Sequence, residues 1–138
     1  KELELNVLLK QYLQDYEEVY DYRNIEVTID EQGVFKVKMN ESLAVALLTN
    51  LLKNAFVHNI DGGHIRITIT KNGITFRNSG VEHPLDKEHI FERFYQGSKK
   101  EGSTGLGLAI ADSICRLQHL NIKYYFEQNE HCFEISQS

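Results

Sequence analysis

Three glycines stand within six positions in the segment GSTGLGLAI, residues 102–110, just before an apolar run of helical character. Glycine loses more conformational freedom on folding than any other residue, so the cluster needs an explanation. One explanation is a flexible loop ahead of a helix. The other is a phosphate-binding loop, in which bare backbone lets an anion approach the free N–H groups at a helix N-terminus. The segment alone leaves both explanations open.

A second segment, LLTNLLKNAFVH at residues 47–58, repeats polar side chains at intervals of four residues. Asn50, Asn54 and His58 therefore form one stripe along a helix, beside its apolar face. A solvated polar edge is the simplest explanation. Asparagine is, however, a mediocre helix former. Its amide oxygen can bind Mg²⁺ and its NH₂ group can donate to phosphate, so the stripe is a candidate for metal and anion binding.

Two familiar glycine motifs do not fit the chain. A P-loop requires a lysine where Ser103 stands. A dinucleotide-binding fingerprint requires a third glycine where Ile110 stands, and a strand directly before Gly105, where the chain is expected to form a loop. If phosphate binds here, it binds in another way.

Hydrophobic periodicity and turn residues predict the elements that position these side chains. The region 79–104 lacks a regular pattern, and loops of this length are usually functional. Asn40 is the expected N-cap of the central helix, whose apolar face comprises Ala44, Leu48, Leu51, Leu52 and Ala55. The expected helices are 1–20, 41–58 and 105–119, and the expected hairpins are 25–39 around Gln32-Gly33, 64–78 around Asn72-Gly73, and 121–136 around residues 128–130.

The length of 138 residues suits one domain, and this order of elements predicts helices layered on one face of a mostly antiparallel sheet. The net charge of −5 argues against a general nucleic-acid binder. No apolar run approaches the length that spans a membrane, and no signal-like segment precedes residue 20. Cys115 and Cys132 lack metal-ligand or disulfide spacing, which indicates reduced thiols in the cytosol.

Taken together, four motifs resemble the catalytic domain of bacterial two-component sensor histidine kinases. NLLKNA at 50–55 is similar to their N box, FRNSG at 76–80 to their first glycine box, IFERFY at 90–95 to their F box, and STGLGLAI at 103–110 to their second glycine box. The motifs occur in the order found in the family, and the resemblance covers nearly the whole chain. The resemblance implies the Bergerat ATP-binding fold: an α+β, two-layer sandwich with three helices on one face of a mixed, mostly antiparallel sheet, and an ATP lid at about 81–104.

The resemblance also implies roles for individual residues in binding ATP and Mg²⁺. Asn54 would coordinate Mg²⁺, Asn50 would support the phosphate and metal shell, and Arg93 would reach a phosphate during transfer. Asn78 would accept a hydrogen bond from the adenine amino group. The other implied contacts are His58 beside the nucleotide, Gly80 in the first glycine box, Phe91 and Phe94 as lid anchors, and Ser103, Thr104, Gly105, Leu106, Gly107 and Leu108 around the phosphates.

Four positions depart from the family pattern. Asn78 replaces the usual aspartate, so a charged acceptor for adenine is lost, and charge-assisted hydrogen bonds are about twice as strong as neutral ones. Val57 stands where a phosphate-contacting lysine is common, Glu82 replaces the second glycine of the first glycine box, and Ser103 replaces the first glycine of the second box. A degenerate, non-catalytic nucleotide-binding or scaffold domain and a serine kinase or ATPase of the same fold therefore remain alternatives.

The family's phosphoacceptor histidine lies on a separate helical dimerisation domain, and none of the six histidines here has a matching helical context. The resemblance therefore implies that the chain is a single catalytic domain, residues 1–138, of a longer kinase. Its partners would be ATP, the dimerisation domain of the same kinase and, indirectly, a response regulator, with no nucleic acid and no membrane contact by this domain itself. The expected location is the cytoplasmic side of a membrane-anchored sensor.

Overall fold

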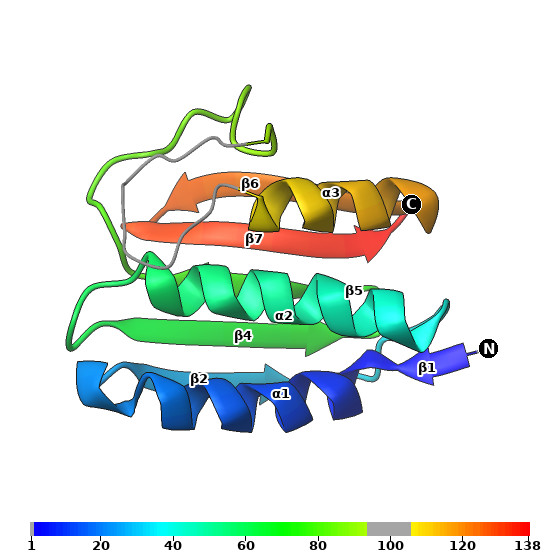
Figure 1. Ribbon diagram of the computed structural model, residues 1–138, viewed down its shortest axis with the longest axis horizontal. Coiled ribbons are helices and arrows are strands. Elements are labelled where there is room, and N and C mark those ends of the chain that lie inside the picture. Colours follow the sequence, from blue (N-terminus) through cyan, green and yellow to red (C-terminus); the bar gives the residue numbers. More distant parts are fainter. Residues whose placement is uncertain (1, 94–105) are drawn as a thin grey trace.

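A computed structural model describes residues 2–93 and 106–138. Three helices, α1 (Leu5–Val19), α2 (Glu41–Val57) and α3 (Gly107–Leu117), lie side by side over one face of a five-stranded sheet (Figure 1). The strand order is β2-β4-β5-β7-β6; β2 and β4 run parallel and every other pair is antiparallel. This arrangement confirms the predicted α+β, two-layer class. The strands of the sheet are β2 (Glu26–Glu31), β4 (His64–Thr70), β5 (Gly73–Asn78), β6 (Leu120–Glu127) and β7 (Glu130–Gln137).

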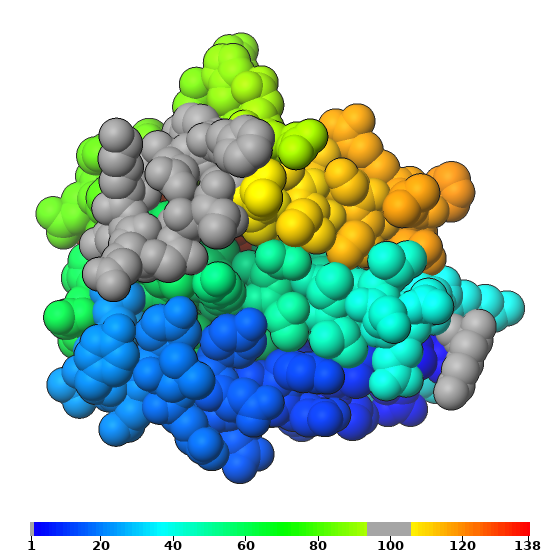
Figure 2. All heavy atoms as spheres, viewed as in Figure 1, coloured from blue at the N-terminus to red at the C-terminus, as the bar shows by residue number. Residues whose placement is uncertain are grey.

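The core lies between the helices and the sheet. Every predicted apolar residue of α2 is buried, and alternate residues of β4 turn Ile65, Ile67 and Ile69 toward the helices. Tyr20 stacks on Phe56 at a centroid distance of 5.4 Å, which joins α1 to α2. Figure 2 shows the three helices packed side by side on the viewed face. This packing fixes α2, the helix that carries the asparagine stripe, in the middle of the layer.

Local signals predicted the helix start and two hairpins correctly. The Asn40 side chain accepts from the Ser42 backbone N–H at 2.8 Å, as an N-cap should. β4 and β5 pair as the hairpin expected at Asn72-Gly73. β6 and β7 pair around Gln128 and Asn129, whose φ angles of 53° and 60° match the tight turn favoured by twisted hairpins.

The predicted hairpin over 25–39 is wrong. β2 pairs parallel with β4, whereas β3 (Lys36–Lys38) pairs with β1 (Glu2–Glu4), a short strand where the sequence predicted helix. Asn6, only 3% exposed, holds the intervening chain: its Nδ2 donates to the Gly33 carbonyl at 2.9 Å and its Oδ1 accepts from the Phe35 N–H at 2.9 Å. A buried side chain thus takes the bonds that a hairpin would have made.

The last helix is shorter than predicted, and the long loop is partly described. α3 begins at Gly107 and ends at Leu117, not 105–119, and His119 reverses the chain with a φ of 57°. Residues 79–93 form neither helix nor strand. Among the described residues, no helix has both the length and the apolarity needed to cross a membrane.

Candidate functional site

Asn78 ends β5 on the helix-covered face of the sheet and is 2% exposed. Its Nδ2 donates to the neighbouring Ser79 carbonyl at 2.8 Å, which fixes the orientation of the amide. Its Oδ1 is buried and has no hydrogen-bond partner among the described residues. A buried acceptor without a partner costs about 1–3 kcal/mol. Asn78 Oδ1 is therefore suited to receive a donor from a ligand.

Asn50 and Gly107 come together where α2 passes the start of α3. The Asn50 Nδ2 donates to the Ala46 carbonyl at 2.7 Å, so its Oδ1 is directed elsewhere. A Cβ placed on Gly107 would lie 3.1 Å from that Oδ1. The glycine thus leaves bare backbone beside an amide side chain at a helix N-terminus, and helix N-termini are where anions can bind.

Asn54 and His58 follow Asn50 along α2, and all three are half-buried. His58 is the C-cap residue, and its backbone N–H donates to the Asn54 carbonyl at 3.1 Å. A Cβ on Gly80 would lie 2.9 Å from the His58 carbonyl, so only glycine lets the chain after β5 pass this close. The stripe therefore borders the start of the proposed lid.

A buried polar network beneath Gly80 joins α2 to β5, and sequence reasoning missed it. The Ser79 hydroxyl donates to Asn59 Oδ1 at 2.5 Å, and Asn59 Nδ2 donates to the carbonyls of Ala55 and His64 at 3.1 and 3.0 Å. Asn59 is fully buried. The sequence offered one signal for this network: a polar residue follows each of two apolar elements, Asn59 after the predicted helix 41–58 and Ser79 after the predicted strand 74–78. The network holds the ends of α2 and β5 together, and these ends carry His58 and Asn78.

Arg23 holds the C-terminus of α2 and was also missed. Its guanidinium donates to the carbonyls of Phe56 and Asn59, the latter at 2.7 Å, and pairs with Asp61 at 2.8 Å. Only 12% of its side chain is exposed. A cation at a helix C-terminus offsets the negative end of the macrodipole and satisfies carbonyls that have no helical partner.

The first two residues of the F-box stretch pack against the core. Ile90 is buried in the core, and the Phe91 ring packs edge-on against Phe133 at 6.3 Å. Arg93 is exposed at the end of the first described range. The remaining second-box residues described, Leu106 and Leu108, are half-buried at the start of α3. Phe94, Ser103, Thr104 and Gly105 lie outside the described residues.

Two of the departures from the family pattern have structural consequences. Val57 is 6% exposed and packs as an apolar residue, so it supplies no phosphate ligand. Glu82 is exposed and accepts from Asn129 Nδ2 at 3.3 Å, which links the proposed lid to the β6–β7 turn. No group of three or more histidine, cysteine, aspartate or glutamate side chains among the described residues could hold a metal ion. A metal ion at Asn54 would therefore need further oxygen ligands from a bound molecule such as the nucleotide.

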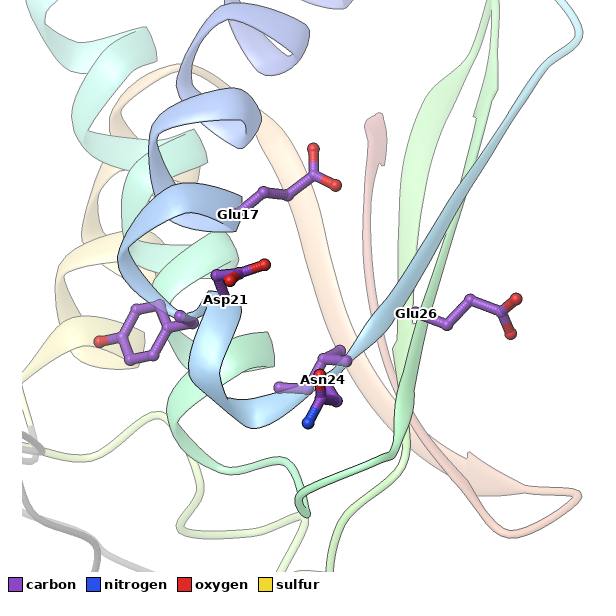
Figure 3. Close-up of a pocket in the computed structure, with 6 residues that line it drawn as sticks. Glu17, Asp21, Asn24 and Glu26 are labelled. Carbon is purple, nitrogen blue, oxygen red and sulfur yellow. The ribbon is translucent and has the colours of Figure 1, made fainter.

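A separate hollow of about 340 Å³ lies where α1 ends and β2 begins. Figure 3 shows Glu17 and Asp21 pointing toward β2, with Glu26 on the far side of that strand. The hollow is lined by carboxylates, which would repel a triphosphate. It therefore gives no alternative site for the nucleotide.

The fold defines a two-layer α/β domain whose central helix carries the candidate site. The chain belongs to the family described as Histidine kinase-, DNA gyrase B-, and HSP90-like ATPase, which it matches over residues 39–136. It is 37% identical over 120 residues to the sensor histidine kinase RppB of Synechocystis sp., covering 80% of this chain and 26% of that protein. It is 32% identical over 127 residues to the heme sensor protein HssS of Staphylococcus aureus, covering 88% and 28%. The chain thus spans about a quarter of the length of these relatives.

Solved structures show the same architecture. The nucleotide-free catalytic domain of the histidine kinase ThkA superposes with a TM-score of 0.84 at 26% identity, covering 98% of this chain and 92% of that domain. ThkA has also been solved in complex with the response regulator TrrA, where the TM-score is 0.78 at 26% identity and the match covers all of this chain and 42% of ThkA. The predicted membership in the histidine kinase type of ATP-binding domain is confirmed.

Proposed function

We propose that this chain binds Mg-ATP and transfers its γ-phosphoryl group to a histidine on a separate dimerisation domain of the same longer sensor kinase, the step that feeds a response regulator. The observation that carries the proposal is the buried, unpartnered Oδ1 of Asn78. It lies at the position where the family resemblance expects the adenine amino group, and an exocyclic amine is the donor this acceptor lacks.

The chain's own groups would bind and orient the nucleotide rather than react with it. Asn78 would select the base, His58 and Gly80 would lie beside it, and Asn50 with the backbone at Gly107 would contact the phosphates. Asn54 would bind Mg²⁺, which supplies positive charge between phosphate oxygens. Arg93 and residues 103–108 of the second glycine box would complete the phosphate contacts. Positioning and charge neutralisation of this kind account for most of the catalysis of phosphoryl transfer.

The lid proposal, residues 81–104, is supported by contacts at the start and in the middle of the segment. Gly80 passes against the His58 carbonyl, and Ile90 and Phe91 fasten the middle of the segment to the core. Phe94 is a proposed anchor of the lid, and Ser103, Thr104, Gly105, Leu106 and Leu108 are proposed contacts to the phosphates. The acceptor imidazole is itself the nucleophile, so no covalent residue is needed on this chain.

The test is phosphotransfer in trans from γ-labelled ATP and Mg²⁺ to the separately expressed dimerisation domain of the same kinase. We expect acid-labile phosphohistidine with the natural chain and none with Asn54→Ala, because alanine suits the helix but supplies no ligand oxygen. Asn121→Ala, an exposed asparagine on β6, is the matched control. ATP binding without transfer would favour the non-catalytic alternative, acid-stable label would favour a serine kinase, and normal transfer by Asn54→Ala would contradict the metal assignment.

A further inference from the structure

His131 on β7 is a buried histidine with both ring nitrogens occupied. It is 3% exposed. Its Nε2 lies 2.7 Å from the Val81 carbonyl, and its Nδ1 lies 2.7 Å from the Tyr124 hydroxyl. Because a carbonyl only accepts, Nε2 carries the proton, and a neutral ring then accepts at Nδ1. The tautomer follows from the partners that the fold provides.

The chain of hydrogen bonds reaches further into the segment after β5. The Leu85 N–H donates to the Tyr124 oxygen at 3.0 Å, and Tyr124 in turn donates to His131 Nδ1. One imidazole therefore holds that segment at two places, directly at Val81 and through Tyr124 at Leu85. We call residues 81–85 the stem of the lid.

The same ring lies against the residues that flank the proposed base site. His131 is the direct register partner of Asn78 across β5 and β7. A Cβ on Gly80 would lie 3.1 Å from His131 Cδ2, so the ring borders the residue that enters the stem. One side chain thus contacts the stem and the glycine that enters it, on the strand position paired with Asn78.

We propose that His131 is a positioning residue of the nucleotide site, which in its neutral form fastens the lid stem beside the adenine acceptor Asn78 and releases it when protonated. This inference rests on the proposed function, because it concerns the same site. A protonated Nδ1 could only donate toward Tyr124, so the tyrosine could no longer donate to the ring and would have to turn its own proton away. The imidazolium would also be a charge buried against the rings of Tyr124 and Phe126. Protonation therefore makes the fastened arrangement costly, and opening of the stem to water relieves that cost.

The surroundings of the ring favour the neutral form at pH 7. Burial lowers the pKa of His131 below its usual 6.5, the Val81 carbonyl opposes that effect, and the nearby His83 adds to it. Tyr124 and Phe126 face the ring from β6, and Asn78 faces it from β5 without charge. Glu130, the adjacent residue, pairs instead with Arg66 of β4 at 2.6 Å. Since the fastened state holds fewer protons, acid below pH 6.5 favours release.

The experiment measures the dissociation constant of Mg-ATP by calorimetry at pH 5.5 and 7.5. For the natural chain we expect weaker binding at pH 5.5, because only the fraction with a fastened stem binds well. His131→Gln retains an N–H for Val81 and does not titrate, and His131→Phe retains the ring but neither bond. We expect the affinity of the natural chain for Mg-ATP, divided by that of His131→Gln at the same pH, to fall as the pH falls. We expect His131→Phe to bind Mg-ATP roughly tenfold more weakly than the natural chain at pH 7.5. Comparison at equal pH cancels the titration of the nucleotide phosphates.

A second measurement needs no nucleotide. Amide exchange at Leu85 reports the bond to Tyr124, and we expect it to accelerate in His131→Phe and at pH 5.5 after correction for the intrinsic rate. Ile135→Val, four residues along β7 and fully buried, is the control for general destabilisation. Failure of the natural chain to bind ATP would overturn the proposed function. Binding by the natural chain with unchanged affinity, pH profile and Leu85 exchange in the His131 variants would overturn this inference alone.

Discussion

The Oδ1 of Asn50 lies 3.1 Å from the place that a Cβ on Gly107 would occupy. The glycine is not there for a left-handed conformation, because Gly62 is the positive-φ glycine among the described residues. It leaves the Asn50 amide undisturbed beside the N-terminus of α3, where a side chain would push that amide aside by a few tenths of an ångström. Within the glycine cluster, Gly107 therefore keeps the space between α2 and α3 open.

The first prediction follows from that distance. Gly107→Ala should keep or raise the free energy of unfolding, because glycine in a helix costs about 0.5–1 kcal/mol relative to alanine. It should weaken Mg-ATP binding by roughly tenfold, because the new methyl group displaces Asn50, a proposed phosphate contact. Calorimetry and thermal unfolding measure the two effects separately. In an Asn50→Ala background the same glycine substitution should cost little more; full additivity would show that Gly107 acts independently of Asn50.

The second prediction concerns the base. Asn78→Leu should weaken ATP binding five- to 150-fold, since a hydrogen bond with a buried partner left unsatisfied is worth about 1–3 kcal/mol. Asn78→Asp should lower the stability of the nucleotide-free chain, because a carboxylate would face the Ser79 carbonyl that now accepts from Nδ2. It should keep or tighten ATP binding through a charge-assisted bond. Unchanged affinity in Asn78→Leu would place the adenine elsewhere.

How much of the fold the sequence predicts depends on the range of the interactions. The β4–β5 and β6–β7 hairpins follow from adjacent residues and were predicted. β2 and β3 were paired wrongly because Gln32-Gly33 has the composition of a turn. A Cβ on Gly33 would lie 2.8 Å from the Lys71 backbone nitrogen, so that glycine permits a long-range contact with the β4–β5 turn. Local patterns carry no information about such a partner 38 positions away.

In the candidate site, too, the residues marked by local patterns were predicted and those that depend on long-range contacts were not. The stripe of Asn50 and Asn54 was visible because helical spacing is regular, and the resemblance singled out Asn78. The residues that hold these side chains in place were not visible: Asn59, Arg23 and His131 each act through contacts between distant segments. Their burial and hydrogen-bond partners, which decide their roles, arise only when the chain folds.

The third prediction tests the helix-capping arginine. Arg23→Ala should lower the free energy of unfolding by about 2–3 kcal/mol, because it strands the carbonyls of Phe56 and Asn59 at the C-terminus of α2. Arg23→Lys should recover only part of this loss, since one ammonium cannot reproduce the planar fork. Urea unfolding measures both variants. Arg116→Ala, whose side chain is 81% exposed, is the control and should change stability little; equal losses in the two alanine variants would contradict the capping role.

The last prediction concerns acid stability and the open face of the sheet. Glu130 is 5% exposed and accepts from Arg66 Nε and Nη2 at 2.8 and 2.6 Å, and from His64 Nε2 at 2.6 Å. These bonds, Arg66 first, hold the pKa of Glu130 at about 2, below its usual 4.5. The folded state thus binds the proton less readily than the unfolded chain. The stabilisation is complete above pH 4.5 and is lost as the pH falls toward 2.

Glu130→Gln removes the titrating group and keeps its shape. We expect the variant to be less stable than the natural chain at pH 7 by about 2 kcal/mol, a value reduced from the full pKa shift because Arg66 is half exposed to solvent. Between pH 4.5 and 2 the two stabilities should converge. Urea unfolding at a series of pH values measures this. Glu134→Gln on the same strand is the control and should change stability little, because its contact to Lys123 is 3.8 Å long. Parallel curves for the natural chain and Glu130→Gln would show that the Glu130 charge contributes nothing to acid stability.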